Sequence, residues 1–400
     1  MPRLIDTLIS YNAGREPERL ALKYAALRQD PLAFLRGTSH LFNARMPEEK
    51  SLYKAPLAWS CGDLHLENFG SYKGDNRLVY FDLNDFDEAT LAPASWSLVR
   101  FVASVLVAAP ALQIKHDEAI EHGRAFIDSY ANALTTGKAR WLERDSAEGL
   151  IREHLEELRG RSRKDFLDSR TKLRGKRRSL RVDGDKALPA SIKQSERVQA
   201  LLAEFAAQQK DPGFFEVLDV ARRVSGNASL GLERYVILVR GKGGPDGNYL
   251  LDLKAAQPSS LTPRLKNPEP RWASDAERAI GVQQMMQASP NAFLHALDLG
   301  RHACTLRELQ PAQDRIDLSQ CVGKSKQFRE LLEQMGQLVA WGQLRSSGRK
   351  SAANADELIE FGQKNKWRAR LLTLAETCAE QVESDWKEYA KAYDDGAFKA

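Results

Sequence analysis

The chain has 400 residues, of which 42% are hydrophobic and 28% are charged, and these ordinary proportions indicate no special class of protein. Its length suits one large two-lobed domain or two ordinary domains. The N-terminal residues lack the apolar core of a signal peptide, and the longest apolar run, residues 101–112, is too short to cross a bilayer. We therefore expect a cytoplasmic protein without a membrane partner. The four cysteines are widely spaced and favour free thiols in a reducing compartment: Cys61, Cys304, Cys321 and Cys378.

The formal net charge of +5 is concentrated in one segment. Between Arg159 and Arg181, eleven lysines and arginines stand against two aspartates, so this segment carries +9 and the rest of the chain −4. Phe166 is its single aromatic residue, which argues against stacking on single-stranded bases and so against a nucleic-acid partner. The segment (residues 159–181) is either a solvated, mobile loop or an electrostatic clamp for an anionic substrate or partner.

Residues 1–50 are predicted to be mainly helical. Apolar residues recur at helical spacing from Glu18 to Leu27, and Asp30-Pro31 ends that helix and allows another to start. Arg36, near the end of the second helix, has two interpretations. A contact to a carbonyl or carboxylate at the helix end is the commoner one, and a contact to a phosphate is the alternative.

The most informative stretch is residues 61–70, Cys-Gly-Asp-Leu-His-Leu-Glu-Asn-Phe-Gly. Asp63 stands five positions before Asn68, and a hydrophobic run at 78–81 leads into an acidic cluster that contains Asp85. This order is typical of a phosphotransfer loop, in which an aspartate beside the attacking hydroxyl is followed by an asparagine and an aspartate that bind Mg²⁺. Carboxylate and amide oxygens suit this hard cation. An ordinary Asp/Asn turn is the alternative, but it leaves the acidic cluster unexplained.

Two motifs in this stretch resemble a known enzyme group. Gly62-Asp63-Leu64-His65-x-x-Asn68 is similar to the catalytic loop of aminoglycoside phosphotransferases and choline kinases, within the protein-kinase-like superfamily. Asp85-Phe86-Asp87-Glu88-Ala89, followed by Trp96-Ser97-Leu98, resembles the metal-binding segment of that group and the start of its buried helix. The whole run resembles more closely an uncharacterised bacterial family assigned to the same superfamily.

The resemblance implies an ATP- and Mg²⁺-dependent phosphotransferase that acts on a hydroxyl-bearing acceptor. Asp63 would position that hydroxyl and accept its proton, and Asn68 and Asp85 would hold Mg²⁺. Asp82 is the alternative metal ligand if the preceding strand ends early, whereas Asp87 would support the loop or remain solvated.

Helical signals follow the acidic cluster. Residues 95–109 are apolar on nearly every side, which predicts a buried helix. Further helices are predicted at 116–134, 141–158 and 189–209.

From residue 213 onward the sequence becomes rich in strand signals. A first strand is followed by Gly226-Asn-Ala-Ser-Leu-Gly231, a second strand at 235–239, a glycine-rich turn and a third strand that ends in Lys254. This layout resembles the small lobe of a kinase, in which loop N–H groups cover the phosphates and the lysine contacts them. The predicted nucleotide-binding residues are therefore Gly226, Ser229, Gly231 and Lys254. Ala228 departs from the motif, because it stands where the middle glycine is expected.

A helix is predicted at 274–287, where a kinase has the helix that orients its lysine. Glu277 is the candidate ion-pair partner of Lys254 at this cofactor-binding site, and Gln283 is the alternative. Two further strands follow, and the backbone near Leu309 would meet adenine.

In kinase-like enzymes a helix such as the one predicted at 326–345 directly precedes the catalytic loop, which here comes much earlier in the chain. The motif order therefore indicates a circularly permuted, two-lobed α+β fold. Residues 1–212 would form the large-lobe core, 213–311 the small β-rich lobe, and 312–400 the helices that complete the large lobe.

Two alternatives to phosphoryl transfer remain open. The same scaffold would serve nucleotidyl transfer. The second alternative is a nucleotide-binding pseudokinase or scaffold whose basic segment engages an anionic partner. The presence of both Asp63 and Asp85 favours catalysis, whereas Ala228 favours the scaffold.

Overall fold

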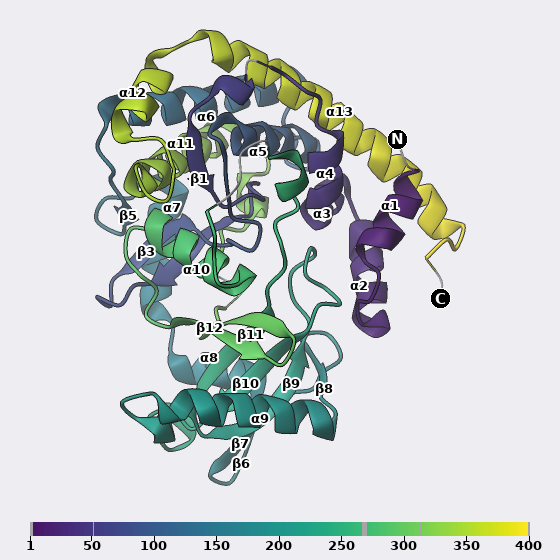
Figure 1. Ribbon diagram of the computed structural model, residues 1–400, viewed down its shortest axis with the longest axis vertical. Helices are drawn as coiled ribbons and strands as arrows, with labels where there is room; N and C mark the ends of the chain where they lie inside the picture. The colour runs from purple at the N-terminus through teal and green to yellow at the C-terminus, as the bar shows by residue number, and fades with distance from the viewer. Residues whose placement is uncertain (1–2, 51, 266–269, 312–313, 399–400) are drawn as a thin grey trace.

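The molecule consists of a part made mostly of helices and a part built on an antiparallel sheet (Figure 1). We call the first part, formed mainly by residues before 159 and after 313, the helical lobe, and the second, formed mainly by the residues between them, the sheet lobe. Leu261, Val282 and Met286 lie within the second range but pack into the core of the helical lobe. The chain is thus an α+β protein, as predicted. None of the helices in the described part of the chain has the length and apolar character that crossing a bilayer requires. The computed structural model describes residues 3–50, 52–265, 270–311 and 314–398.

The helical lobe forms around α5 (Ser95–Ala108), every residue of which is buried. Helices α6 (His116–Thr136) and α13 (Lys366–Asp394) pack on α5, and α11 (Ser325–Ser346) packs on α6. The buried helix predicted at 95–109 is confirmed, since a helix that is apolar all round is stable only inside a core. Near α6 lies α12 (Ala355–Gln363).

Four short helices begin the chain, and they confirm the predicted helical N-terminus. The Asp30 side chain accepts a hydrogen bond from the Ala33 N–H (2.7 Å), which starts the third helix after Pro31. The first helix lies beside the C-terminal end of α13, and the second descends toward the sheet lobe (Figure 1). The helices are α1 (Leu4–Tyr11), α2 (Pro17–Leu27), α3 (Pro31–Gly37) and α4 (Ser39–Arg45).

Two small antiparallel pairings hold the acidic loops of the helical lobe together. The first joins β1 to β4, and the second joins β2 to β3, so the loop after β1 lies beside the loop after β3. The strands are β1 (Leu57–Ser60), β2 (Phe69–Lys73), β3 (Val79–Leu83) and β4 (Thr90–Pro93).

The helix predicted at 141–158 begins later than expected. Its first residues form β5 (Leu142–Glu143), where Leu142 pairs with Phe81 of β3. Helix α7 (Gly149–Glu157) then follows a turn. Tertiary pairing with β3 therefore overrides the local helical signal.

The sheet lobe is built on six antiparallel strands in the order β12-β13-β11-β10-β9-β8. The predicted order of strand, glycine loop, strand, turn and strand is confirmed, and Lys254 lies near the end of the third of these strands. The helix predicted at 274–287 is also confirmed, as α10 (Asp275–Met286). The strands are β8 (Ala187–Pro189), β9 (Val217–Arg223), β10 (Arg234–Val239), β11 (Tyr249–Ala255), β12 (Leu294–Leu299) and β13 (His302–Glu308).

Helix α9 (Ile192–Ala207) lies across one face of this sheet (Figure 1). Its apolar stripe, which includes Val198 and Leu202, packs against Ile237 and Leu253. The sheet lobe therefore begins before residue 213, because α9 and β8 share its sheet and core.

The basic segment is folded, so its interpretation as a mobile loop is wrong. It forms α8 (Arg163–Arg170) and a hairpin of β6 (Thr171–Arg174) and β7 (Arg177–Leu180). The physical reason is Arg178, whose guanidinium is buried and donates to the Pro245 carbonyl (2.6 Å).

Candidate functional site

One cavity between the lobes brings most of the predicted residues together. It has a volume of about 310 Å³. Residues from the loops after β1 and β3 face residues from β9, β10 and β11 across it. The predicted residues that line it are Asp63, Asn68 and Asp85 from the helical lobe, and Gly226, Ser229 and Lys254 from the sheet lobe.

Asn68 joins the two acidic loops. Its side-chain N–H₂ donates to the carbonyls of Asp63 (2.8 Å) and Asp85 (3.2 Å), and its Oδ1 accepts from the Asp85 N–H (2.9 Å). The side chain is 1% exposed. Asn68 therefore holds Asp63 and Asp85 at one edge of the cavity, which an ordinary turn within the first loop would not do.

Asp63 forms a buried ion pair with Arg100 of α5. The Arg100 Nε donates to Asp63 Oδ1 (2.6 Å), and its Nη2 also donates to the Leu35 carbonyl (2.9 Å). Burial raises the pKa of Asp63 above its usual range, and the guanidinium limits this rise. The sequence motif did not identify Arg100, although a lone arginine inside an apolar helix was a usable signal.

The oxygen ligands at this edge fit Mg²⁺. Asp85 offers a carboxylate, and the amide oxygen of Asn68 has a second lone pair beside its bond to the Asp85 N–H. Asn84 lines the same cavity, and its Oδ1 is buried without a hydrogen-bond partner in the described structure. The described residues contain no group of three or more His, Cys, Asp or Glu side chains placed to hold a metal. This donor set suits an ion that takes one or two protein carboxylates together with phosphate oxygens and water.

Lys254 extends from β11 into the cavity and forms an ion pair with Asp87. Burial lowers the pKa of Lys254 to about 8, against the opposing charge of Asp85. Burial also opposes the ionisation of Asp85, but Lys254 and nearby arginines outweigh it, so the pKa of Asp85 lies below its usual range. The lysine and the acidic cluster therefore form one electrostatic unit.

Glu277 is not the ion-pair partner of Lys254, and that prediction is corrected. Glu277 is exposed in the first turn of α10, where its N–H donates to Ser274 Oγ (3.2 Å). The buried face of the helix instead presents Arg278, which donates to the Asp87 carbonyl (3.0 Å). Gln283, the alternative, is buried and donates to Gln287 Oε1 (3.1 Å).

Asp82 is placed outside the cavity. Strand β3 continues to Leu83, so the condition for Asp82 as a metal ligand, an early strand end, is not met. Its carboxylate is buried against Arg345 of α11, 2.8 Å from Nη2.

The glycine loop between β9 and β10 contributes part of its length to the cavity. Gly226 (φ 77°) and Ser229 line it, and the Arg234 guanidinium donates to Ser229 Oγ (3.4 Å). Gly231 (φ 86°) is not among the lining residues, because it packs against the N-terminal helices, where its carbonyl accepts from the Glu16 N–H (2.9 Å). Both glycines adopt backbone conformations that side-chain-bearing residues disfavour.

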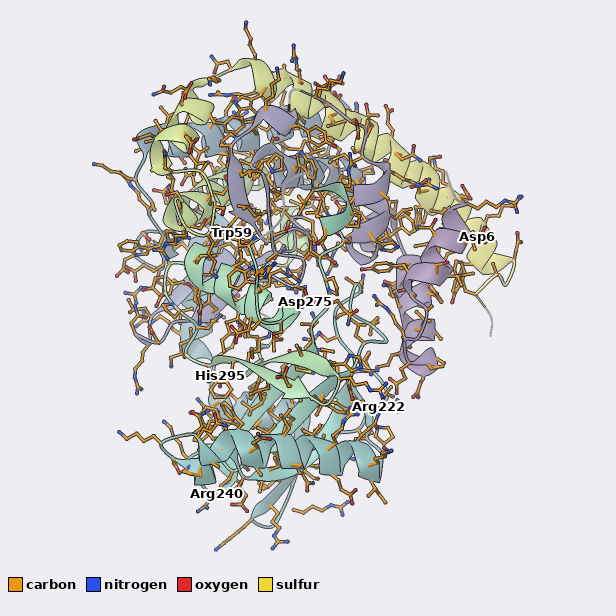
Figure 2. The ribbon with its side chains drawn as sticks, viewed as in Figure 1. Asp6, Trp59, Arg222, Arg240, Asp275 and His295 are labelled. Carbon is orange, nitrogen blue, oxygen red and sulfur yellow. The ribbon has the colours of Figure 1, made fainter. Side chains whose placement is uncertain are left out.

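The N-terminal helices hold this loop from outside. Arg15 Nη1 donates to the carbonyls of Ala228 (2.7 Å) and Leu230 (2.9 Å), and Lys23 Nζ donates to Ala228 (3.0 Å). Arg222 of β9 pairs with carboxylates at the start of α2, beside which it lies (Figure 2). No local motif pointed to Arg15 or Lys23, because their partners are about two hundred positions away in the sequence.

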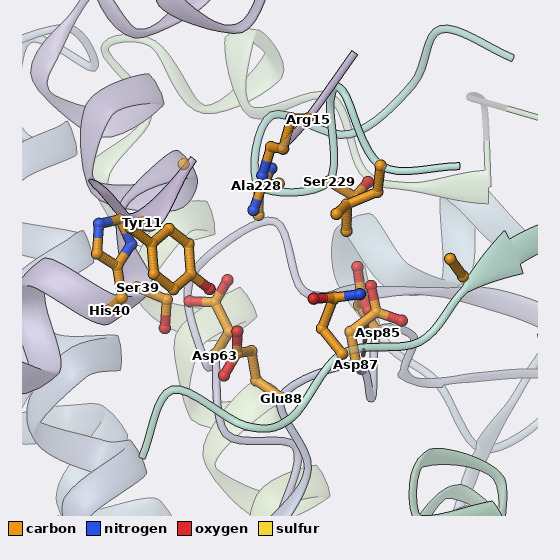
Figure 3. Close-up of a pocket in the computed structure, with 14 residues that line it drawn as sticks. Tyr11, Arg15, Ser39, His40, Asp63, Asp85, Asp87, Glu88, Ala228 and Ser229 are labelled. Atoms are coloured by element: carbon orange, nitrogen blue, oxygen red, sulfur yellow. Dashed lines mark hydrogen bonds between the residues drawn. The ribbon is translucent and has the colours of Figure 1, made fainter. Parts of the chain in front are cut away.

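A second, smaller hollow of about 50 Å³ adjoins the larger cavity at Asp63. Figure 3 shows Tyr11, Asp63 and Glu88 around it, with Arg15 and Ala228 nearby. The Tyr11 ring stacks on His40 with 3.5 Å between ring centroids. The two hollows share Asp63, Asp85 and Ser229 among their lining residues, so the Asp63 carboxylate borders both of them.

The backbone near Leu309 borders two cavities, because Gln310 and Pro311 line the larger one and Leu309 lines a neighbouring one of about 260 Å³. The Leu309 N–H itself donates to the Leu250 carbonyl (2.8 Å), so an adenine contact near this residue stays a prediction. The larger cavity is strongly cationic, since eight lysines and arginines line it against four carboxylates among the described residues. Among these cations, sequence reasoning identified Lys254 and considered Arg36 and Arg223 as alternative phosphate contacts.

Comparison with known proteins places the chain in a bacterial family whose description names no activity. No curated protein and no solved structure matches the chain. A model of the family DUF2252, described as an uncharacterized protein conserved in bacteria, matches residues 15–392. The matched range includes both acidic loops, the glycine loop and Lys254, and the chain therefore belongs to this bacterial family.

Proposed function

We propose that the protein is an ATP- and Mg²⁺-dependent phosphotransferase with a circularly permuted, kinase-like arrangement of two lobes. The observation that carries this proposal is the shared cavity of Lys254, Asp63 and Asp85. Lys254 meets Asp87 although 167 positions separate them in the sequence. The order of a glycine loop, a strand lysine and a helix in the sheet lobe supports the same assignment.

The acceptor would enter the hollow beside Asp63. Its oxygen forms a bond to the γ-phosphorus while the bond from that phosphorus to the β–γ bridging oxygen breaks, so ADP leaves. Asp63 receives the acceptor's proton late in this step, and its raised pKa suits that role. Arg100 fixes the carboxylate in place, which lowers the entropic cost of alignment.

The donor phosphates would lie between Lys254 and the acidic loops. Mg²⁺ at Asp85 and Asn68 would neutralise charge on the β- and γ-phosphates. Lys254 would release Asp87 and pair with phosphate oxygens, a strong interaction in a site shielded from water.

Turnover of ATP by the purified chain tests this proposal. We expect Mg²⁺-dependent release of ADP that falls by about a thousandfold in Asp63→Ala and Asp85→Ala, while the exposed Glu121→Ala on α6 leaves it unchanged. Turnover that is insensitive to both site variants would contradict the proposal. If turnover depends on both residues, incubation with labelled ATP and mixed metabolites would identify the acceptor.

A pseudokinase is the second candidate, and one observation favours it. Asp63 is paired with Arg100 and Lys254 with Asp87, so the protein itself neutralises both groups. Tight binding of ATP without turnover would support this candidate. Release of pyrophosphate instead of ADP would point to nucleotidyl transfer.

A further inference from the structure

The face of the sheet that looks into the cavity is divided into a charged half and an apolar half. Alternate residues of a strand share a face, and on β10 these are Arg234, Val236 and Leu238. Arg234 lines the cavity, whereas Val236 and Leu238 belong to an apolar cluster. On the neighbouring strand β11, Lys254 pairs with Arg234 in the charged half, and Leu250 pairs with Leu238 in the apolar half.

The apolar half is covered by the chain itself. Leu167 of α8 and Leu180 of β7 pack against Val236, Leu238 and Leu250 in one buried cluster. Leu167 is 1% exposed and Leu238 is fully buried. A flat purine or pyrimidine that used this surface would have to displace both covering leucines.

The cover is anchored to the sheet lobe. Buried Arg178 pairs with Asp168 (2.6 Å) on α8 and with Asp246 (2.8 Å) in the turn between β10 and β11. The Leu180 N–H donates to Asp219 Oδ2 on β9 (2.8 Å). These bonds make α8 and the β6–β7 hairpin part of the folded lobe.

The charged half has an excess of positive charge. Arg223, Arg234 and Arg307 converge on the single carboxylate of Asp252, with nitrogen–oxygen distances of 2.5, 2.6 and 3.4 Å. One carboxylate balances one of these three charges. Guanidinium groups bind phosphate oxygens in bidentate fashion, so this surface suits a chain of phosphates.

The cover adds cations of its own to the cavity. Arg170, at the end of α8, and Lys186, before β8, line it. Among the described residues neither side chain forms an ion pair within 4 Å, although Asp183 and Asp185 lie close enough to act on the charge of Arg170. The basic segment therefore blocks the apolar surface and extends the phosphate-binding one.

We propose that the cavity binds its phosphoryl donor through the phosphate chain alone, so that inorganic triphosphate and nucleoside triphosphates of any base are equivalent ligands. This inference rests on the proposed function for the role of the ligand as donor. It predicts that the base remains outside the Leu167–Leu180 cover.

Calorimetric titration of the full chain with Mg²⁺ and a set of ligands tests the inference. We expect inorganic triphosphate, ATP, GTP and CTP to have dissociation constants within about threefold of one another, and adenosine not to bind. Affinity for ATP more than tenfold above that for GTP and triphosphate, or binding of adenosine, would overturn it. Failure of triphosphate to bind at all would overturn it as well.

A pair of double variants tests the role of the cover. Arg170→Ala/Lys186→Ala changes two side chains at the cavity, and we expect at least a fivefold loss of triphosphate affinity that grows smaller at high salt. Lys172→Ala/Lys176→Ala removes the same charge from exposed positions of the hairpin that do not line the cavity, and we expect no loss. Equal effects of the two double variants would overturn the inference.

The inference and the proposed function fail separately. Transfer from ATP with strong preference over GTP would remove the inference and leave the phosphotransferase. Equal binding of all triphosphates without any Mg²⁺-dependent turnover would remove the phosphotransferase and leave the binding site as inferred.

Discussion

The two walls of the cavity are built in different ways. The acidic wall comes from one short stretch, residues 63–88, and Asn68 holds it through hydrogen bonds to its own neighbours. The cationic wall comes from segments scattered over most of the chain, and long-range ion pairs such as Arg234–Asp252 hold it. A local motif thus specifies the acidic wall, whereas tertiary packing assembles the cationic one.

The largest expected effect is in the acidic wall. Asp85→Asn removes a carboxylate that its surroundings keep ionised, so we expect Mg²⁺-dependent turnover to fall by about a thousandfold or more. Asp87→Asn, which removes the partner of Lys254, should cost about tenfold. Initial rates with ATP measure both, and equal losses would show that Asp85 has no special role.

The second-largest effect is expected at Arg100, which supports the acidic wall through its ion pair with Asp63. Arg100→Met leaves the Asp63 carboxylate buried without its partner, and we expect the free energy of unfolding to fall by about 3–5 kcal/mol. Urea denaturation measures this. Asp63→Asn added to Arg100→Met should recover part of the loss, and a double variant as unstable as the single one would contradict the ion-pair account.

The attachment of the glycine loop to the N-terminal helices is expected to have a moderate effect. Arg15→Ala removes two hydrogen bonds to loop carbonyls, so we expect affinity for triphosphate to fall by about tenfold. Amide exchange of residues 224–233 should become faster at the same time. Arg28→Ala, which removes an exposed pair with Asp394, is the matched control and should change neither quantity.

The smallest effect concerns the dependence of stability on pH. Burial lowers the pKa of His40 to about 3. Below pH 6.5 the unfolded chain therefore binds a proton at His40 that the folded chain does not, and the free energy of unfolding decreases as the pH decreases. His40→Phe keeps a ring against Tyr11. When the pH is lowered from 7.5 to 5.5, its free energy of unfolding should decrease by about 1 kcal/mol less than that of the original chain. Identical pH profiles from thermal unfolding would contradict this.

The parts that sequence reasoning identified are those with a local pattern. Asp63, Asn68 and Asp85 stand in one motif, Lys254 ends a predicted strand, and the apolar α5 was recognisable from composition. Glu277 was chosen from its position in a helix, but neighbouring residues of a helix point in directions about 100° apart, and the buried face carries Arg278 instead.

The parts that sequence reasoning missed depend on packing between distant segments. Arg15 and Lys23 act on carbonyls of a loop that lies about two hundred positions away. The basic segment was taken as a loop or a clamp from its charge, because no local signal shows that Arg178 is buried against the turn between β10 and β11. Charge patterns identify a segment, and its partners decide its structure.

The central claim is that Lys254 and the carboxylates of Asp63 and Asp85 face one bound triphosphate. A crystal structure of the full chain with Mg²⁺ and a non-hydrolysable ATP analogue tests it most directly. We predict that the phosphates lie between Lys254 Nζ and Asp85, with the γ-phosphate nearest to Asp63. An analogue bound elsewhere would contradict the claim. A Lys254 side chain that still pairs with Asp87 and does not contact the phosphates of the analogue would contradict it as well.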